Sequence, residues 1–400
     1  IPLRLVGSEM CIRDRLEHYD ELSDHIKVET KDPDLYPKFT SQYTDQTVAA
    51  NSVIVVCGDK SKVVSNSDMW ETSTNYQTYQ TQTTGFDGEG QITSAITYVT
   101  SENNPKVYWV TGHGEASESD LSTNFSDAVN KNNVEISDLA LMTDDIPEDA
   151  EELVIMSPTT DFSEDEANKV ITYLENGGKL LMFTSYTGTD MPNLDSILEN
   201  YGVKRSSGIV VETDSQHYYP QMPYYLLPNI QSDDITTEVK SNYILMPVAQ
   251  AIQKLDSYRD TITIKSLLTT TEDAYIENDP ENSTWSKSAD SETGAFDLGV
   301  SITETVDDKE TQIIYFSSAS MLSSQIDQAI SGANSKLAAT ALTSMCDVEQ
   351  TVVIPSKSTS YTNLVFTQGA VNTWSIITIA GIPLVLVVIG VMIWMKRRKQ

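Results

Sequence analysis

Residues 152–183 read ELVIMSPTTDFSEDEANKVITYLENGGKLLMF. Apolar runs at 153–157 and 180–184 enclose a stretch in which Ser163 and Glu166 have the spacing of a helix capping box. Apolar residues then recur at helical spacing until a Gly-Gly pair, where a helix would end. The stretch therefore predicts strand, helix and strand. Two continuous apolar strands joined by an amphipathic helix are typical of a parallel sheet covered on both faces.

The same alternation extends to both sides of this stretch. Residues 107–111 and 134–141 predict further strands, with an amphipathic helix between them. The second half is less regular, with strands expected at 203–213, 262–269, 298–303 and 311–317, a helix at 336–345, a surface loop at 218–228 and a mobile acidic loop at 273–293. We therefore predict one doubly wound α/β domain over residues 105–350.

Residues 16–104 predict a separate small α/β unit of thioredoxin-like form, without a redox motif. Its expected elements are a helix at 16–22, a strand at 26–30, a hairpin of 53–56 with 62–65, a polar irregular excursion at 66–85 and a linking helix after Phe86. Cys57 lies in an apolar run and Cys346 near the end of an Ala-rich helix, which predicts buried thiols. A disulfide between them is permitted outside the cytoplasm, but sequence gives no geometric support for it.

Residues 1–15 are kept apart from the fold prediction. The run MCIRDR at 10–15 resembles a translated sequencing adapter, which makes residues 1–15 an expected sequencing artefact. We therefore expect that natural sequence upstream of Leu16 has been lost, including an N-terminal membrane span.

The C-terminal segment 376–395 carries no charged residue and runs directly into the basic residues 396–399. As a helix it would reach about 30 Å, which matches the hydrocarbon core of a bilayer. Trp374 and Trp394 flank it as interfacial anchors. Because basic residues stay in the cytoplasm, the body is expected outside the cell membrane. The predicted order is a polar stalk at 351–373, a transmembrane helix at 374–395 and a cytoplasmic tail at 396–400.

Charge and motif content exclude several classes of function. The net charge of −32 argues against DNA or RNA binding, because such a body repels phosphate. There is no GxxxxGK[ST] loop, so the chain is not itself an ATPase, and no GxSxG elbow. The four histidines show no metal-ligand spacing, and we expect neither a metal nor a cofactor. The acidic residues at 144–152 form either a weak Ca²⁺ site or a solvated loop.

The sharpest local feature is Thr111-Gly112-His113-Gly114-Glu115, directly after the first strand of the predicted sheet. Doubly wound folds hold ligands at this end of their strands. His113 and Glu115 supply a base and a carboxylate, while Gly112 and Gly114 would let a ligand approach the backbone. The alternative is a tight turn whose His and Glu make structural hydrogen bonds. Residues 112–115 are the candidate ligand-binding residues, and no catalytic set is predicted.

A second candidate is the aromatic segment that contains Tyr218, Tyr219, Tyr224 and Tyr225 between prolines. Tyrosine supplies amphipathic contact area at low entropic cost, which favours binding to a partner. The alternative is a loop folded against its own domain.

Several stretches, taken in order, resemble the Gld-type auxiliary proteins of ABC transporters, a family named after gliding motility. They are KDPDLYP at 31–37, NSVIVVCGDKSKVV at 51–64, FDGEGQITSAITYVT at 86–100, KVYWVTGHGE at 106–115, the run at 152–183 and VNTWSIITIAGIPLVLVV before the basic tail. The resemblance implies a flavodoxin-like or glutamine-amidotransferase-like central sheet and an N-terminal membrane helix. It also implies a separate permease and ATPase as partners. Amidotransferase activity is not expected, since no cysteine follows a strand of that sheet.

We therefore expect a non-catalytic, membrane-anchored extracytoplasmic accessory subunit that docks on a permease or presents a cell-envelope ligand. Two other functions stay open. One is an extracytoplasmic ligand sensor or hydrolase that uses the TGHGE loop. The other is a module that receives a polysaccharide or peptide for export.

Overall fold

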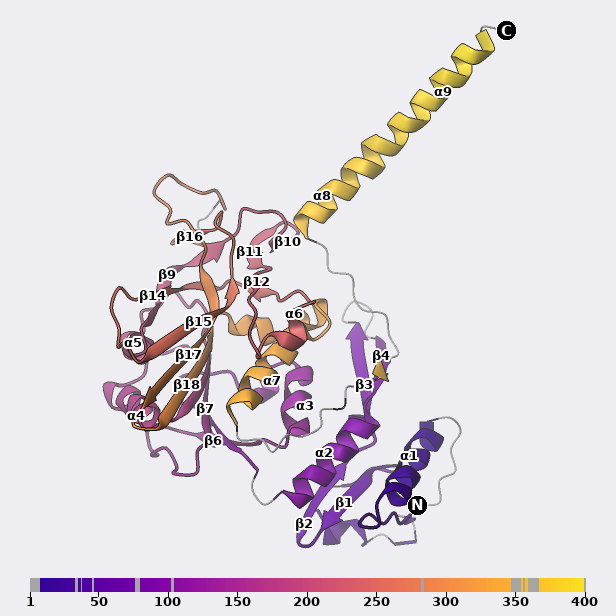
Figure 1. Cartoon of the computed structure of the whole chain (residues 1–400), viewed down its shortest axis with the longest axis vertical. Coiled ribbons are helices and arrows are strands. Elements are labelled where there is room, and N and C mark those ends of the chain that lie inside the picture. The colour runs from indigo at the N-terminus through magenta and orange to yellow at the C-terminus, as the bar shows by residue number, and fades with distance from the viewer. Residues whose placement is uncertain are drawn as a thin grey trace. The chain divides into compact units, whose positions relative to one another are not determined.

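The computed structural model describes residues 8–32, 35–36, 38–44, 47–75, 80–101, 104–281, 284–346, 354, 357–358 and 367–398 (Figure 1). The chain forms two compact units. The N-terminal unit comprises Ile1–Lys106, Ser126–Ile136 and Cys346–Thr362, and the sheet unit comprises Val107–Phe125, Ser137–Met345 and Asn363–Gln400. Both units mix helices and strands, which confirms the predicted α/β class.

The N-terminal unit is built on a helix pair and a hairpin. Helix α1 (Ser8–Leu22) and helix α2 (Gly88–Thr100) accompany strands β1 (Val53–Cys57) and β2 (Lys60–Val64). The two strands pair antiparallel around Gly58, as predicted. A small core holds the unit together and contains Ile12, Val64, Met69 and Ala95. Helix α1 begins at Ser8, inside the segment left out of the fold prediction.

Three expectations for this unit are wrong. Residues 26–30 form no strand, and the next element among the described residues is the short 3₁₀ turn η1 (Thr40–Gln42). The polar stretch 66–85 is not irregular: after η2 (Ser67–Met69) it forms β3 (Trp70–Asn75) and β4 (Gln80–Phe86), and β4 also pairs with β19 (Lys357–Ser358). Threonine favours extended backbone despite its polarity, because its branched Cβ packs well on a pleated surface.

The third error concerns Cys57, which is exposed, whereas Cys346 is buried as expected. Cys57 ends a strand of a two-stranded sheet, where no further strand covers it. The two thiols are not joined in a disulfide.

An eleven-stranded sheet forms the centre of the sheet unit. Across it lie, in order, β16 (Tyr275–Glu277), β9 (Val203–Val211), β14 (Gln250–Lys254), β17 (Asp297–Val306), β18 (Lys309–Phe316), β8 (Lys179–Phe183), β7 (Glu152–Met156), β5 (Lys106–Val110) and β6 (Glu135–Leu139), while β15 (Ile262–Thr269) pairs with β17 and with β12 (Asn229–Ile230). Strands β18, β8, β7 and β5 run parallel to one another.

Antiparallel pairs join β12 to β15, β15 to β17, β17 to β18, β14 to β17 and to β9, and β16 to β9, so the sheet is mixed rather than wholly parallel. The turn between β17 and β18 shows the physical reason. Asp307 and Asp308 both have positive φ, at 50° and 62°. Two such residues form a tight hairpin turn, and a tight turn can join only antiparallel strands, because parallel strands need a long crossover.

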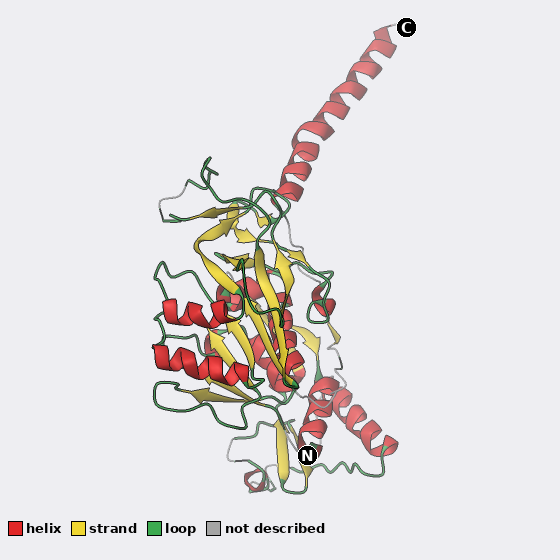
Figure 2. Cartoon of the chain, turned by 60° about the vertical axis from the view of Figure 1, so that its left-hand side comes forward, coloured by secondary structure: helices red, strands yellow, loops and turns green. Residues whose placement is uncertain are grey.

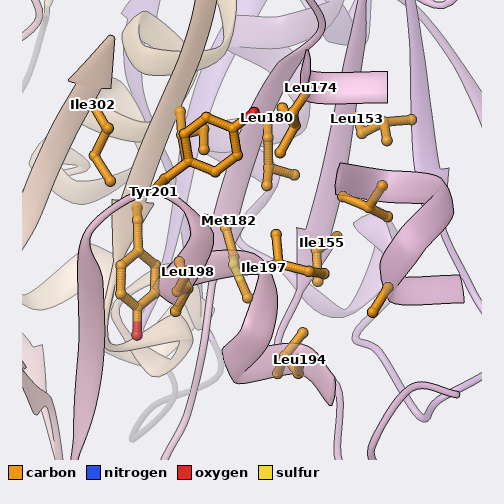
Figure 3. Packing of buried hydrophobic residues seen from close by; sticks show 14 of the residues in the cluster. Leu153, Ile155, Leu174, Leu180, Met182, Leu194, Ile197, Leu198, Tyr201 and Ile302 are labelled. Atoms are coloured by element: carbon orange, nitrogen blue, oxygen red, sulfur yellow. The ribbon is translucent and has the colours of Figure 1, made fainter. Parts of the chain in front are cut away.

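Helices cover both faces of the parallel strands. Helix α4 (Glu164–Glu175) and helix α5 (Pro192–Asn200) lie together on one face (Figure 2). Helix α7 (Ala333–Met345) contacts β8 from the opposite face. Figure 3 shows Leu174 of α4 and Ile197 of α5 packed among strand side chains such as Leu180. Each such buried side chain contributes about 2 kcal/mol. The capping box of Ser163 with Glu166 is present, as predicted.

The segment 218–228 is not a plain surface loop. It forms β10 (Tyr218–Tyr219) and β11 (Met222–Leu226), and β11 pairs with β13 (Met246–Pro247). The stalk expected at 351–373 falls largely on residues outside the described ranges. The remaining described elements are η3 (Glu118–Asp120), α3 (Thr123–Lys131), which contains a boundary between the two units, η4 (Thr237–Val239), η5 (Ala319–Leu322), α6 (Ser324–Ala329), α8 (Gln368–Ile376), the π-helical turn η6 (Ile377–Gly381) and α9 (Ile382–Arg398).

Candidate functional site

The TGHGE loop lies at the point where the strand order of the parallel sheet reverses. After β5 the chain proceeds to β6 on one side of β5 and then returns to β7 on the other side. The carboxyl ends of β5 and β7 are therefore at the position where doubly wound folds hold ligands. Gly112 and Gly114 have φ values of +123° and +76°, so the loop needs the backbone freedom of glycine at both positions.

Two carboxylates hold the imidazole of His113. Its Nδ1 lies 3.2 Å from Oε1 of Glu115, and its Nε2 lies 3.3 Å from Oε2 of Glu166 at the start of α4. The backbone N–H of His113 also donates to Oε2 of Glu115, at 2.7 Å. All three side chains are 5 % exposed or less. Each ring nitrogen is therefore within hydrogen-bonding distance of one carboxylate oxygen.

Protein groups also fill the space around the histidine. The His113 carbonyl accepts hydrogen bonds from the backbone N–H groups of Thr159 and Thr160, which follow β7. The ring of Phe162 lies 4.3 Å from the imidazole, centroid to centroid. A Cβ on Gly114 would overlap the side chain of Thr159. The loop after β5 and the loop after β7 are thus joined to each other by hydrogen bonds and close packing.

Glu166 links this cluster to the helix. Burial opposes its ionisation, but hydrogen bonds from the Ser163 hydroxyl and backbone N–H and the charge of His113 outweigh burial and hold the Glu166 pKa below its usual value. Its second oxygen, Oε1, is buried and has no hydrogen-bond partner among the described residues. The carboxylate therefore serves the helix cap and the imidazole at once.

This arrangement leaves His113 little capacity for acid–base chemistry. A general base needs a ring nitrogen that reaches a substrate, and both nitrogens of His113 face carboxylates inside the protein. One strained residue nearby was not singled out from the sequence. Ser157 follows β7 with φ of +53°, and its hydroxyl donates to Ser185 Oγ at 2.8 Å rather than to a base. No sequence signal marks it, since positive φ at a serine is set by the surrounding loops.

The four tyrosines of the second candidate all lie half-buried on the β10–β11 hairpin. Tyr224 contacts Tyr225 at 5.4 Å between ring centroids. It also contacts Trp285 at 4.4 Å, a residue that sequence analysis did not connect with this segment. Sixty positions of chain separate the two, so no local pattern could have joined them. The tyrosines are therefore part of a folded hairpin that keeps an aromatic surface.

The acidic stretch 144–152 does not form a single cluster. Glu152 is buried in β7, whereas Asp145 is exposed and pairs with Lys169 at 2.9 Å. Within the ranges that the structure describes, no group of three or more His, Cys, Asp or Glu residues could hold a metal ion.

The C-terminal helix is long and apolar enough to cross a membrane. It runs from Gln368 to Arg398 without interruption through α8, η6 and α9, and none of its most apolar window is buried by the rest of the chain. Thirty-one residues span about 46 Å as a helix, more than the thickness of a hydrocarbon core. The predicted anchor at 374–395 lies within this helix.

Several solved structures show a remote likeness to this chain. The N-terminal domain of mmIFT52 matches at 15 % identity and a TM-score of 0.44, over 60 % of this chain and 96 % of that one. The exo-β-1,4-mannosidase Op5Man5 from Opitutaceae bacterium strain TAV5 matches at 10 % and 0.31, over 67 % and 38 %. A ThuA-like protein from Parabacteroides merdae matches at 12 % and 0.33, over 66 % and 99 %. No curated protein gives a match.

A family model gives the decisive comparison. The model for ABC-transporter auxiliary proteins, described as an ABC-type uncharacterized transport system, matches residues 104–344. The matched stretch runs from the start of β5 to the end of α7 and so contains the whole eleven-stranded sheet. The chain belongs to the family of auxiliary proteins of ABC-type transport systems.

Proposed function

We propose that the chain is a non-catalytic extracytoplasmic subunit of an ABC transporter, held in the cell membrane by Gln368–Arg398 and docked on the permease. The observation that carries this proposal is the exposed apolar helix, ending in Lys396, Arg397 and Arg398, on a chain of an auxiliary family. A subunit of this kind needs a separate ATPase, since the chain has no phosphate-binding loop of its own.

The basic end of the helix supports the proposed orientation. Lys and Arg beside a membrane span stay in the cytoplasm, which leaves the body on the outer side. The body itself is acidic, with 58 Asp and Glu residues against 26 Lys and Arg in the whole chain. Such a surface is compatible with an extracytoplasmic position and unsuited to nucleic acid.

The resemblance of several ordered stretches to Gld-type proteins supports a narrower assignment within the family. We take the chain as a Gld-type member whose role is to dock on the permease or to present a cell-envelope ligand to it. The contacts of His113 favour this non-enzymatic role, because its two ring nitrogens are engaged by Glu115 and Glu166.

Co-purification tests the partnership. The full chain, tagged and extracted in a mild detergent, should retain a permease and an ATPase encoded beside it. The matched control is a chain in which Gly381 and Gly390 of the span are replaced by bulky leucines, which changes the surface of the helix without adding charge. If the unaltered chain retains neither the permease nor the ATPase, the accessory role is refuted.

Cys57 offers a native reporter for the orientation, because its thiol is exposed. A maleimide that cannot cross membranes should label intact cells that carry the chain, and the labelling should fall in Cys57→Ser. Labelling that appears only after the membrane is permeabilised would place the body in the cytoplasm and overturn the orientation.

One observation favours the ligand-sensor or hydrolase alternative: the TGHGE loop lies where the strand order reverses. If this alternative holds, His113→Ala and Glu115→Ala abolish ligand binding or activity in chains that still assemble with the permease. If the accessory role holds, any loss in these variants follows the loss of folded protein.

A further inference from the structure

We propose that the β10–β11 hairpin, residues 215–227, lies on the lipid headgroups of the leaflet from which Gln368–Arg398 emerges. The inference rests on the proposed membrane anchoring of that helix and adds a second membrane contact to it. Nothing in the anchoring itself requires the folded body to touch lipid, because a single helix suffices to hold a protein in a bilayer.

Hydrogen bonds tie the hairpin to the first turn of the membrane helix. The N–H of Gly369 donates to the Ser215 carbonyl at 2.7 Å, and the N–H of Gln221 donates to Oε1 of Gln368 at 2.9 Å. The hydroxyl of Thr367, which caps the helix, donates to Oε1 of Gln216 at 3.0 Å. Figure 1 shows β10 and β11 beside the start of α8.

These contacts set the hairpin at one level along the helix. Ser215 lies before β10 and Gln221 lies in the turn after it, yet both contact the first two residues of α8. The segment between them therefore runs across the helix axis rather than along it. Gly369 permits the close approach, because a Cβ there would overlap the Gln216 side chain.

The length of helix between this level and the apolar span is short. Gly369 precedes Ile376, the first residue of the charge-free apolar segment, by seven positions. Seven helical residues rise about 10 Å, and the headgroup layer extends about 5–8 Å beyond the hydrocarbon core on each side. A hairpin tied at Gly369 is consequently brought to the outer edge of the headgroups.

The composition of the hairpin fits this position. No Asp, Glu, Lys or Arg occurs from Ser215 to Ser232, in a chain with 58 acidic residues in 400. Of the acidic residues just before it, Glu212 is buried, and Asp214 is half-buried and accepts the backbone N–H of Gln216. An acidic surface would be repelled by anionic headgroups, and the hairpin removes that repulsion where the chain meets the membrane.

The side chains of the hairpin suit an interface between water and lipid. Tyr218, Tyr219 and Tyr225 are half-buried, and Met222 at the turn is 38 % exposed. Tyrosine and tryptophan concentrate at headgroup level, where one end of the side chain is apolar and the other is wet. Leu226 is buried and ties the hairpin into the domain.

Depth-dependent quenching tests this assignment on the full chain in phosphatidylcholine vesicles. A fluorophore is placed at Met222→Cys after Cys11, Cys57 and Cys346 have been changed to serine. A nitroxide on the lipid headgroup should remove most of its fluorescence. The matched control is Met142→Cys, an exposed methionine of the same unit at 70 % exposure, which should keep its fluorescence.

A third label separates this inference from the proposed function. A fluorophore at Ile389→Cys, inside the apolar segment, should be quenched by a nitroxide deep in the acyl chains. If it is not, the anchoring fails and the inference fails with it. If Ile389 is quenched but Met222 behaves like Met142, the hairpin inference alone is overturned. If the fluorophore at Met222 escapes quenching by the headgroup nitroxide and is shielded only when a permease is added, the surface contacts protein instead of lipid. This result would equally overturn the inference.

The unaltered chain gives an independent readout if the cysteine-free variant does not fold. Phosphatidylcholine that carries a photoreactive group on its headgroup is activated in the same vesicles, and adducts are mapped by mass spectrometry. Adducts should appear on residues 215–227 and near Trp374. Their absence from 215–227, together with their presence near Trp374, would overturn the inference.

Discussion

The TGHGE loop and the β10–β11 hairpin, both within the sheet unit, use their polar and aromatic side chains in opposite ways. His113 is 4 % exposed, and both of its ring nitrogens face carboxylates of the same domain. The tyrosines of the hairpin are half-buried, and no Asp, Glu, Lys or Arg occurs from Ser215 to Ser232. Met222 at the turn is exposed. In the loop, the polar side-chain atoms contact other groups of the same domain. In the hairpin, the side chains stay partly accessible from outside the domain.

This contrast shows that position in a fold is not enough to identify a site. The loop lies at the end of the sheet where doubly wound folds bind ligands, yet its polar groups contact other groups of the protein. The hairpin is tied to α8, the first part of the helix that is long and apolar enough to cross a membrane. In this chain, the accessibility of the side chains is a better indicator of a binding site than their position in the sheet topology.

The largest effect should come from His113→Ala. The change removes the imidazole from between two buried carboxylates, Glu115 and Glu166, which keep only their hydrogen bonds to backbone and Ser163 groups; loss of the partner of a buried charge typically costs about 3–5 kcal/mol. Thermal unfolding of the full chain in detergent measures it. His217→Ala is the matched control, because His217 is half-buried and makes one side-chain contact, to the Leu227 carbonyl, so about 1 kcal/mol is expected. Equal losses in both variants would contradict the structural role of the loop.

Gly114→Ala should have the next largest effect. The substitution forces a side chain onto a backbone with φ of +76° and against the Thr159 side chain, for a loss of about 2 kcal/mol. Gly188→Ala separates the two causes. Gly188 has a similar φ of +69° but its nearest neighbour is 3.7 Å away, so only the backbone strain of about 1 kcal/mol remains. The same unfolding assay compares them, and a milder effect at Gly114 would argue against the close packing of the two loops.

Acid should weaken the same cluster. The folded-state pKa of Glu166 lies below the ordinary value of 4.5 for an unfolded glutamate. Its ionised form therefore contributes stability that is fully present above about pH 4.5 and is lost as the pH falls through the folded pKa. Unfolding midpoints between pH 7 and pH 3 should fall more steeply for the unaltered chain than for Glu166→Gln. Parallel curves would show that Glu166 carries no such linkage.

The smallest change in global stability should come from the hairpin. Gly369→Ala pushes a methyl group into the Gln216 side chain and separates the hairpin from α8, at a cost of less than about 1 kcal/mol because alanine also favours the helix. Hydrogen exchange should nevertheless speed up at the Gln221 amide. Gly390→Ala, where a Cβ meets no atom within 4 Å, should leave that exchange unchanged. Unaltered exchange in both variants would mean that the hairpin is not held by the helix.

Sequence patterns identified the parts of this chain that obey a regular period. The strand, helix and strand of 152–183 were recognisable because their apolar residues repeat and Ser163 marks the start of the helix. The hairpin β1–β2 and the C-terminal helix were predicted for the same reason. The strands at 70–86 were missed because their residues are polar, and the mixed sheet was missed because strand direction depends on turns such as Asp307-Asp308.

The candidate sites divide in the same way. His113, Glu115 and the four tyrosines could be named from sequence, since their residue types stand out locally. Glu166 and Trp285 could not be joined to them, because Glu166 is 53 positions from His113 and no local pattern marks contacts at that range.

By itself, the amino-acid sequence determined the α/β class and the apolar C-terminal helix with its basic end, because periodicity and uninterrupted hydrophobicity are properties of neighbouring residues. Only the tertiary structure decided that His113 is held between two carboxylates and that the tyrosine hairpin is tied to α8. Such contacts form when distant segments pack together, and their geometry depends on the whole domain rather than on any local pattern.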